Sequence, residues 1–323
     1  MHRVWVERKL PERFLVALQA SAQVVGCAID TPNDPFCALT GAEAIIAGSR
    51  LRYDAAVFDR TSSLRVVSRS GIGVDNVDIA SATARGIAVC NTPDAPTVST
   101  VEHTWLLLLA VARKLRDIDI RMRAGRTTDF FSVHTGTELR GRVLGVVGLG
   151  RIGGEVARLG TAFGMRVVGY DPFVASDRSA QLGIEAVSAL EALLVQADFV
   201  SLHLPPTPET YHMFNRELLR RMKRGACLIN CARGSLIDES ALLEALQDGH
   251  LAGAGLDVFE REPPPPDHPL LQRLDVIATP HIASATAASK DRSFEAAISQ
   301  ALQVLEGQRP RHLVNPEVWG NRD

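Results

Sequence analysis

The chain has 323 residues, of which 46% are apolar, and a formal net charge of −2. A chain of this length exceeds what one hydrophobic core usually serves, so we expect two domains. The near-neutral charge and the scattered Lys and Arg residues argue against nucleic-acid binding, and the apolar run 105–112 is too short to cross a membrane.

The first part of the chain, up to about residue 94, alternates short β-prone runs with helical segments. Residues 1–9 mix charged side chains with Val and Trp and do not resemble a secretory signal. We therefore expect a cytoplasmic location. Helical patterns at 11–20 and 76–84 separate some of the β-prone runs. This rhythm predicts a parallel α/β domain. The β-prone runs are 4–6, 24–28, 44–46, 66–68 and 88–90.

A long helix is predicted next. Ser99, with Glu102 three positions later, has the spacing of a capping box ahead of the apolar run 105–109. The adjacent pair Glu102 and His103 could be catalytic, but capping and core packing explain it, so we leave both residues out of the site. The N-cap candidates are Thr97, Ser99 and Thr100.

From residue 143 the alternation of strands and helices becomes more regular. Parallel strands with crossover helices predict a doubly wound sheet. The proline run 263–266 can continue neither a helix nor a strand, and it predicts a surface loop after the fifth strand. An amphipathic helix is expected from residue 285 to about residue 307. The six predicted strands are 143–147, 166–170, 199–202, 227–230, 253–257 and 276–278.

The stretch GLGRIGG, residues 148–154, lies between a predicted strand and a predicted helix. GxGxxG strings are common, but this context is typical of a dinucleotide cradle, where backbone N–H groups and the positive helix end hold a pyrophosphate. Gly148 permits the tight turn, Gly150 lets the phosphates approach the backbone, and Gly153 allows the helix to pack closely on the strand.

The next predicted strand leads into Asp171, about twenty residues beyond the glycines, where a carboxylate holds a ribose diol and repels a 2′-phosphate. Neither Pro172 nor Phe173 supplies a compensating arginine. The sequence therefore predicts NAD rather than NADP. The alternative is that Asp171 only shapes the turn before Pro172.

Ionisable groups follow the last three predicted strands, at the edge where open α/β sheets bind ligands. Arg233 can hold a carboxylate by a two-pronged hydrogen bond, and His281 can exchange a proton with a carbonyl oxygen. Glu262 beside the imidazole would raise the pKa of His281. Each residue alone could be an ordinary surface group, but together they suit hydride exchange between an alcohol and a ketone next to a carboxylate.

Other reactive residue types are interpreted more simply. Asp257 stands at a strand end and is a candidate for the nicotinamide end of the cofactor, whereas the histidines 203, 212 and 268 are interpreted as structural or solvent-exposed. Asp257, Glu260 and Glu262 have no histidine beside them, so we expect no metal. The five cysteines lack a CxxC pair and are interpreted as reduced thiols: Cys27, Cys37, Cys90, Cys227 and Cys231.

Six segments between residues 68 and 284 form a distinctive series. They are SRSGIGVDNVDI (68–79), ELRGRVLGVVGLGRIGGEVAR (138–158), HLPPTPET (203–210), MKRGACLINCARGSLIDE (222–239), GLDVFEREP (255–263) and ATPHIAS (278–284). Together they resemble the D-isomer-specific 2-hydroxyacid dehydrogenases. The resemblance implies two Rossmann-like or flavodoxin-like parallel-sheet domains, the first discontinuous. Residues 1–94 and 285–323 would form the substrate-binding domain, and 95–284 the NAD-binding Rossmann domain.

The resemblance also implies roles for single residues. Arg233, Glu262 and His281 fall on the family's catalytic positions, in agreement with the argument from the strand ends. Substrate would be bound by Ser70, Gly71, Ile72, Gly73, Arg233 and His281. Beyond the three glycines and Asp171, the cofactor would be contacted by Ile72, Arg151, Ile152, Leu204, Cys231, Ala232, Arg233, Asp257, His281 and Ser284.

The implied function is NAD-linked hydride transfer between a small D-2-hydroxyacid and its 2-oxoacid, by a homodimer. The alternatives are an NAD-sensing protein resembling the family's corepressor branch, and a formate- or phosphite-type dehydrogenase. Gly48 precedes Ser49 where phosphoglycerate dehydrogenases tend to have arginine, which argues against that substrate unless Arg50 or Arg52 substitutes. Residues 95–96 are Ala-Pro where the family usually has Gly-Asn, and no regulatory extension follows.

Overall fold

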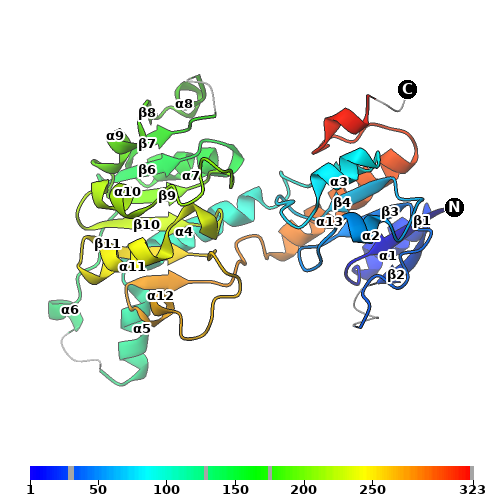
Figure 1. The fold of residues 1–323 in the computed structure, drawn as a ribbon. Helices are drawn as coiled ribbons and strands as arrows, with labels where there is room; N and C mark the ends of the chain where they lie inside the picture. Colours follow the sequence, from blue (N-terminus) through cyan, green and yellow to red (C-terminus); the bar gives the residue numbers. More distant parts are fainter. Residues whose placement is uncertain (28–32, 127–129, 174–176, 321–323) are drawn as a thin grey trace. The chain divides into compact units, whose positions relative to one another are not determined.

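The computed structural model describes residues 1–27, 33–126, 130–173 and 177–320. Contacts divide the chain into two units, Met1–Thr97 with Ala285–Asp323 and Val98–Ser284, so that the chain passes between them twice (Figure 1). We call them unit 1 and unit 2 and describe each by itself. Within the described ranges, no helix has both the length and the apolar character needed to cross a bilayer.

Unit 1 contains a five-stranded parallel sheet of order β2-β1-β3-β4-β5. This is the flavodoxin-like order, in which the connections change direction between β1 and β3. The predicted strands agree with it, except that residue 28 lies outside the described residues. The strands are β1 (His2–Val6), β2 (Ala22–Cys27), β3 (Ala44–Ala47), β4 (Val66–Arg69) and β5 (Ala88–Cys90).

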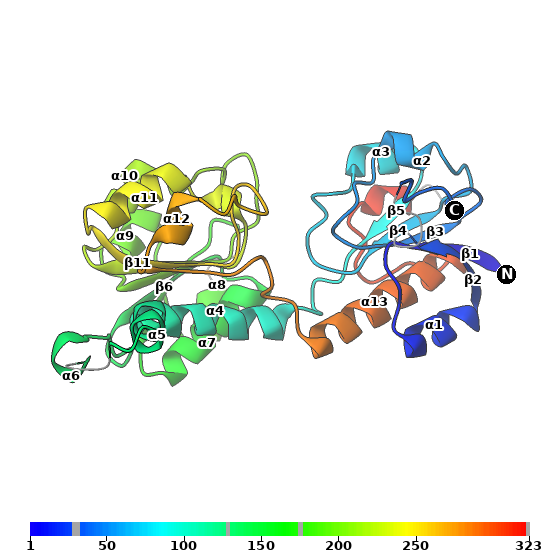
Figure 2. The same cartoon turned by 90° about the horizontal axis from the view of Figure 1, so that it is seen from below.

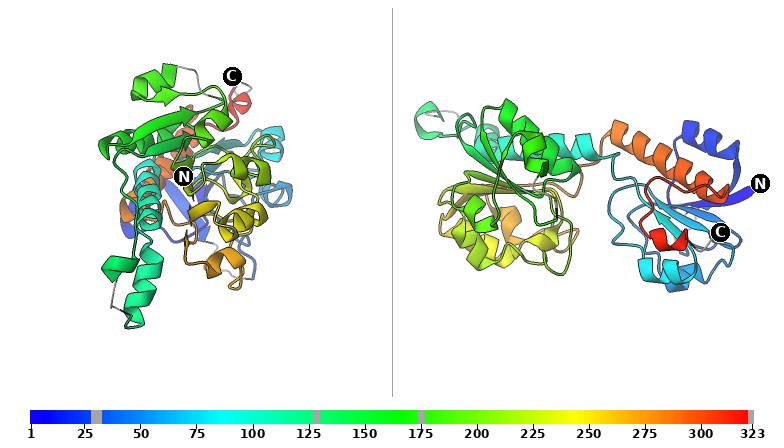
Figure 3. Two further views of the ribbon diagram at one scale, coloured as in Figure 1. Left: turned by 90° about the vertical axis from the view of Figure 1, so that its left-hand side faces the viewer. Right: turned by 90° about the horizontal axis from the view of Figure 1, so that it is seen from above.

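Helices cover both faces of this sheet (Figure 2 and Figure 3). Because successive strand residues point to opposite faces, Val4 and Val6 pack with α13 (Ala287–Leu305), whereas Trp5 packs on the other side. The helices of unit 1 are α1 (Glu12–Gln19), α2 (Ala55–Phe58), α3 (Ile79–Ala84) and α13, followed by the 3₁₀ helix η3 (Pro316–Val318).

Unit 2 contains a seven-stranded parallel sheet of order β12-β11-β10-β9-β6-β7-β8. The six strands β6 to β11 follow the Rossmann order, and β12 is added at the edge beside β11. The short, exposed strand β8 (Glu185–Ala186) was not predicted, because two exposed residues leave no hydrophobic pattern. The other strands are β6 (Val143–Val147), β7 (Arg166–Tyr170), β9 (Phe199–Leu202), β10 (Ala226–Asn230), β11 (Leu251–Leu256) and β12 (Val276–Ala278).

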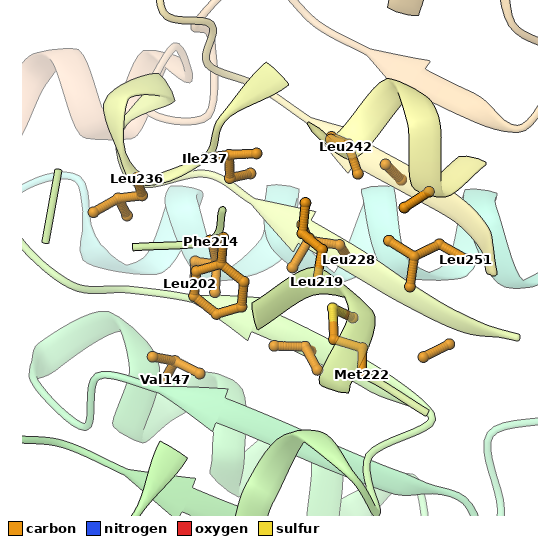
Figure 4. Packing of buried hydrophobic residues seen from close by; sticks show 14 of the residues in the cluster. Val147, Leu202, Phe214, Leu219, Met222, Leu228, Leu236, Ile237, Leu242 and Leu251 are labelled. Carbon is orange, nitrogen blue, oxygen red and sulfur yellow. The ribbon is translucent and has the colours of Figure 1, made fainter. Parts of the chain in front are cut away.

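The strand residues of unit 2 also alternate between two cores. Leu144 and Val146 pack with α4 (Thr97–Ala112) and α7 (Arg151–Ala162), and Val147 packs with the helices of the other face (Figure 4). The remaining helices are α5 (Leu115–Arg123), α6 (Phe130–Val133), α8 (Asp177–Leu182), α9 (Leu190–Leu194), α10 (Arg216–Arg221), η2 (Gly234–Leu236), α11 (Glu239–Gln247) and α12 (Pro269–Gln272).

One predicted local feature is wrong. Helix α4 begins at Thr97, so Ser99 already lies in its first turn and cannot be the N-cap of a capping box with Glu102. Ser99 and Thr100 are buried, and the Thr97 hydroxyl donates to Pro93 O at 3.3 Å. The proline run 263–266 lies in the loop between β11 and α12, as its composition predicts.

Candidate active site

The glycine-rich turn joins β6 to α7. Gly148 has a φ of +98°, and a Cβ there would lie 2.7 Å from the backbone of His203. A Cβ on Gly153 would lie 1.8 Å from Gly148 O, so glycine is required for the helix to begin this close to the strand. Around Gly150, the N-cap residue of α7, a Cβ would meet nothing within 4 Å. The turn leaves open space at a helix N-terminus, where an anionic group is stabilised.

Asp171 follows β7 and binds the backbone through both carboxylate oxygens. Oδ2 accepts from Leu149 N at 2.6 Å, and Oδ1 accepts from Phe173 N at 2.8 Å. The carboxylate therefore shapes its own turn and also lies beside the glycine-rich turn. Sequence reasoning missed Arg178 in α8, whose Nε donates to Leu149 O at 3.4 Å and whose Nη2 would lie 3.0 Å from a Cβ on Gly154.

Arg233 lies three residues beyond the end of β10, in a loop that packs tightly against the loop after β11. A Cβ on Gly234 would lie 2.0 Å from the backbone carbon of Phe259, so the two loops touch backbone to backbone. Asn230 fixes the Arg233 loop, because its side chain accepts from Ala232 N at 2.9 Å and donates to Arg233 O at 2.8 Å. The Arg233 guanidinium donates to Ala232 O at 2.8 Å.

Glu262 and His281 form an ion pair. His281 Nδ1 and Glu262 Oε2 are 2.7 Å apart, and Glu262 Oε1 accepts from Phe259 N at 3.1 Å. Burial alone would raise the pKa of Glu262. The pKa is nevertheless lowered, mainly by the hydrogen bond and the charge of His281 and to a smaller extent by Phe259 N–H and Arg233. The charge of Arg233 also acts on the pKa of His281, so the structure brings the three residues into one electrostatic group.

The pKa of His281 is raised above its ordinary value, mainly by the hydrogen bond to Glu262. Partial burial opposes this shift, and the charge of Glu262 supports it. His281 also has a φ of +53°, an uncommon backbone conformation for a residue with a side chain. A raised pKa favours the protonated imidazole, and because the His281 side chain is partly exposed it can donate a proton to a bound molecule.

Asp257 lies one residue beyond β11 and is buried. Its Oδ1 accepts from Thr279 Oγ1 at 2.6 Å and from Ile282 N at 2.9 Å, and its Oδ2 accepts from Ala283 N at 2.8 Å. Its backbone carbonyl accepts from His281 N at 2.7 Å. These bonds hold the loop that carries His281. His103, left out of the site by sequence reasoning, reaches the same group through Thr279, at 2.9 Å.

The other candidate cofactor residues of unit 2 surround the same strand ends. Leu204 is buried after β9, and its N would lie 3.0 Å from a Cβ on Gly148. Burial raises the pKa of Cys231 to about 12, so this residue is a thiol and not a nucleophilic thiolate. Arg151 and Ser284 are exposed, and Ile152 is partly buried against the core.

The three histidines that the sequence analysis interprets as structural or solvent-exposed, His203, His212 and His268, each lie near a polar side chain. His203 is half-buried with its ring 2.8 Å from Ser201 Oγ, and burial lowers its pKa to about 3. His212 and His268 lie 3.2 Å from Glu260 and 3.1 Å from Glu239, respectively. Among the described residues, no group of three or more His, Cys, Asp or Glu side chains is arranged to hold a metal.

The candidate substrate loop, residues 70–73, belongs to unit 1 and follows β4. Ser70 N and Oγ both donate to Ala47 O, at 2.9 and 3.0 Å, and Ile72 O accepts from the Asn91 side chain at 2.8 Å. These bonds do not use the N–H groups of Ile72 and Gly73. Backbone N–H groups arranged in this way can donate to a carboxylate.

A buried carboxylate lies behind the neighbouring loop of unit 1. Glu7, directly after β1, accepts from Gly48 N at 2.7 Å, Arg50 N at 3.0 Å and Tyr53 Oη at 2.7 Å. A Cβ on Gly48 would lie 2.3 Å from Glu7 Oε1, so this position cannot carry a side chain while Glu7 keeps its place. The side chains of Arg50 and Arg52 are exposed.

Residues 105–283 match the protein family described as D-isomer specific 2-hydroxyacid dehydrogenase, NAD binding domain. The glyoxylate reductase of Korarchaeum cryptofilum is 41% identical over 321 residues, which cover 98% of this chain and 96% of the relative. The chain belongs to the D-isomer specific 2-hydroxyacid dehydrogenase family.

Two further comparisons show similarity over nearly the whole of this chain. The D-3-phosphoglycerate dehydrogenase of Methanocaldococcus jannaschii is 38% identical over 98% of this chain, which spans 60% of that relative. The TT0316 protein from Thermus thermophilus has a crystal structure that is 42% identical, with a TM-score of 0.89, over 97% of this chain and 99% of that chain. The resemblance inferred from sequence motifs and the two-sheet fold are therefore confirmed.

As a member of this family, the chain is an NAD-binding oxidoreductase of the 2-hydroxyacid dehydrogenase type. The chain spans 48% to 60% of the length of the related phosphoglycerate dehydrogenases, but nearly all of the glyoxylate reductase.

Proposed function

We propose that the chain catalyses reversible hydride transfer between NAD(H) and a small D-2-hydroxyacid or its 2-oxoacid. The observation that carries this proposal is the ion pair of His281 and Glu262, with the charge of Arg233 acting on both, at the carboxyl ends of strands of the sheet that also carries the glycine-rich turn. This edge of a doubly wound sheet is where such folds bind ligands.

Each of the three residues has a distinct proposed task. Arg233 holds the substrate carboxylate with its planar guanidinium and polarises the neighbouring carbonyl. His281 donates the proton to the carbonyl oxygen during reduction and takes it from the hydroxyl during oxidation. Glu262 positions the imidazole through Nδ1, which directs Nε2 toward the substrate, and keeps it protonated before reduction.

The residues around the glycine-rich turn fit a dinucleotide. The open space at Gly150 admits a pyrophosphate next to the N-terminus of α7, where Arg151 and Ile152 would contact it. Bound NAD would supply the hydride acceptor, and NADH the hydride. The other proposed contacts are Gly148, Gly153, Asp171, Leu204, Cys231, Ala232, Arg233, Asp257, His281 and Ser284 in unit 2, and Ile72 in unit 1.

We propose NAD as the cofactor, because Asp171 presents a carboxylate beside the glycine-rich turn. Arg178, which donates to Leu149 O, is a residue that would bind a 2′-phosphate if one were present. The test compares kcat/KM for NADH and NADPH in the wild type, Asp171→Ala and Arg178→Ala. A wild type that prefers NADPH, and loses that preference in Arg178→Ala, would contradict the choice of NAD.

The proposed substrate is a small 2-oxoacid without a phosphate. In unit 2, the substrate carboxylate would bind Arg233, and His281 would meet the carbonyl oxygen. In unit 1, the backbone N–H groups of Ile72 and Gly73 are the proposed carboxylate donors. Position 48 carries no side chain, and the buried carboxylate of Glu7 behind it disfavours a second anionic group. The related glyoxylate reductase covers the whole chain and supports the same class of substrate.

A screen of NADH oxidation tests the proposed function. The substrates are glyoxylate, hydroxypyruvate, pyruvate, bulkier 2-oxoacids and phosphohydroxypyruvate. We expect turnover with a small 2-oxoacid and a lower kcat/KM for phosphohydroxypyruvate than for hydroxypyruvate. If phosphohydroxypyruvate is preferred, and Arg50→Ala or Arg52→Ala removes that preference, the phosphate-free assignment is wrong. NADH binding without turnover of any 2-oxoacid would instead favour the NAD-sensing alternative.

We also propose that the chain forms a homodimer through unit 2. Apolar side chains are exposed on α4 and α5, at Leu106, Leu109, Leu115, Ile120 and Met122, and on α6 at Phe131. A pocket lined in part by Met122 and Phe131 lies beside them, away from the proposed active site. Exposed apolar groups of this kind are typical of a protein interface. Molar mass in solution, measured by light scattering, tests the dimer.

A further inference from the structure

His103 is the first member of a chain of hydrogen bonds that leads to the loop of His281. Its Nε2 lies 2.9 Å from Thr279 Oγ1, and Thr279 Oγ1 lies 2.6 Å from Asp257 Oδ1. His103 Nε2 also lies 3.4 Å from Asp257 Oδ1, a longer and therefore weaker contact than either bond through the hydroxyl. The His103 side chain is 11% exposed and that of Asp257 is fully buried. Residue 103 lies on α4, whereas residue 279 follows β12, so the contact joins parts of unit 2 that are 176 residues apart in the sequence.

The direction of hydrogen bonding along this chain follows from the number of available protons. Asp257 accepts from two backbone N–H groups, those of Ile282 and Ala283, and the donors around it keep its pKa low although burial opposes this. An ionised carboxylate only accepts, so the single hydroxyl proton of Thr279 points to Asp257. The Thr279 oxygen must then accept from His103, which places a proton on His103 Nε2.

Asp257 in turn forms hydrogen bonds with residues that precede and follow His281 in the sequence. Its side chain binds residues 279, 282 and 283, and its backbone carbonyl accepts from His281 N at 2.7 Å. The φ of +53° at His281 is unfavourable for a residue with a side chain, and it persists where surrounding bonds enforce it. The loop conformation that presents His281 to Glu262 therefore depends on the Asp257 carboxylate staying aligned.

We propose that His103 is a positioning residue of this dehydrogenase, acting through Thr279 and Asp257 to hold the 279–283 loop in the conformation that directs His281. The inference rests on the proposed function, because it assumes that His281 exchanges the proton. His103 itself is not assigned any contact with the substrate.

A purely packing role would not require an imidazole at this position. An apolar side chain of similar size would fill the same space on α4, but it would leave the Thr279 oxygen without its donor. Buried polar chains of this kind act as a unit, so loss of the first donor weakens the bonds that follow. Core packing alone therefore predicts that leucine replaces His103 without a change in catalysis, whereas positioning predicts a catalytic defect.

The charged and titratable groups near this chain decide how the pH profile responds. Two titratable groups face His103 from neighbouring elements, namely Asp257 after β11 and the thiol of Cys231 after β10. On α4 itself the adjacent Glu102 is exposed. Beyond Asp257 lies His281, whose pKa is raised mainly by Glu262 and to a smaller extent by the charge of Asp257. A misaligned or protonated Asp257 would lower the pKa of His281.

Four variants test the proposal in matched pairs. His103→Leu and Thr279→Val remove the donors, whereas His103→Gln and Thr279→Ser keep a donor at each place. His250→Leu removes an imidazole elsewhere in unit 2 and serves as control. For each protein, kcat and KM for 2-oxoacid reduction are measured across pH, with NADH affinity by fluorescence and the melting temperature as checks on folding and cofactor binding.

We expect His103→Leu and Thr279→Val each to lower kcat by about tenfold, the usual effect of one lost positioning hydrogen bond. The loss of reductive activity at high pH should begin at a lower pH, because His281 is then less easily protonated. KM and NADH affinity should change less than kcat. The double variant should be no worse than either single variant. His103→Gln, Thr279→Ser and His250→Leu should keep the wild-type pH profile.

A wild-type kcat and pH profile in His103→Leu would overturn the proposal, as would a profile changed in His103→Leu but not in Thr279→Val. If His103→Leu does not fold, the Thr279→Val and Thr279→Ser pair decides, since His103 acts through that hydroxyl. His281→Asn separates this inference from the proposed function. If His281→Asn remains active, the proposed function fails, whereas an inactive His281→Asn beside a normal His103→Leu rejects the inference alone.

Discussion

The two units carry a glutamate at comparable places, yet the two carboxylates have different surroundings. Glu7 follows a strand of unit 1, is buried, and is bound by two backbone N–H groups and a tyrosine hydroxyl. Glu262 lies in the loop after a strand of unit 2, is partly exposed, and is bound to a histidine. The parallel sheet brings acidic groups to its carboxyl edge in both units, but the partner determines whether the acid organises a loop or tunes a proton donor.

The pKa of the titratable partner is raised in both units, but the consequence differs. Burial, with the charge of Glu7, raises the pKa of Tyr53, so its hydroxyl stays neutral and serves only as a donor. Glu262 raises the pKa of His281 toward the range in which enzymes transfer protons. We therefore expect the buried carboxylate of unit 1 to serve the structure, and we propose that the partly exposed one of unit 2 serves the chemistry. Replacing the members of each group tests this difference.

The largest effect is expected for His281→Asn. Asparagine keeps a polar side chain but cannot donate a proton as imidazolium does, so kcat should fall by roughly 10²–10⁴-fold, the usual contribution of a general acid. NADH affinity, measured by fluorescence titration, should change little. Near-normal turnover would remove His281 from the proposed mechanism.

Arg233→Ala should lower kcat/KM for the 2-oxoacid by roughly 10- to 100-fold, because charge-assisted hydrogen bonds to the substrate carboxylate are lost. Arg233→Lys is the matched control, since it keeps the charge without the planar fork and should recover only part of the loss. Steady-state kinetics with NADH at saturation measure both. An unchanged response to 2-oxoacid concentration in Arg233→Ala would contradict the carboxylate clamp.

Glu262→Gln should lower kcat for reduction by about tenfold, as expected for loss of one charge-assisted hydrogen bond. Because Glu262 raises the pKa of His281, this variant should lose reductive activity at a lower pH than the wild type. The oxidative direction, which needs neutral imidazole, should extend to lower pH. The measurement is a pair of kcat/KM profiles against pH, and identical profiles for variant and wild type would argue against the tuning role.

Glu7→Gln makes the same carboxylate-to-amide change in unit 1, with the smallest expected effect on chemistry. The amide group has one fewer acceptor for the three donors around it, which should destabilise the protein by about 1–3 kcal/mol. Thermal or urea unfolding measures this loss. The pH at which reductive activity falls should remain that of the wild type, and a shift matching that of Glu262→Gln would erase the proposed difference between the two acids.

The fold was largely predictable because its signals are local. Short β-branched runs bounded by glycine and polar residues marked the strands of both sheets, and the glycine-rich turn followed from its place between a strand and a helix. The two-residue strand β8 has no such pattern. The capping box was wrong because the sequence offered several hydroxyl residues in a row, and helix α4 begins at the first of them, Thr97.

The ion pair of the candidate site was predictable for a different reason. His281 and Glu262 follow neighbouring parallel strands, and the sheet topology brings such ends together. His103 could not be connected to them, since its partner Thr279 is 176 residues away and its own neighbours suggested a buried helix face. Arg178 was missed similarly, because it approaches the glycine-rich turn only after α8 folds onto α7.

The three glycines of the turn differ in their tolerance to substitution. An alanine at 153 or 148 would collide with backbone atoms of the protein itself, so a defect there would combine misfolding with lost affinity. Gly150 has a φ of −66°, which any amino acid adopts, and a methyl group there meets no protein atom. Gly150→Ala should therefore yield a correctly folded protein that binds dinucleotide weakly. In this variant, the thermal stability and the oligomeric state can be measured without the effects of a bound cofactor.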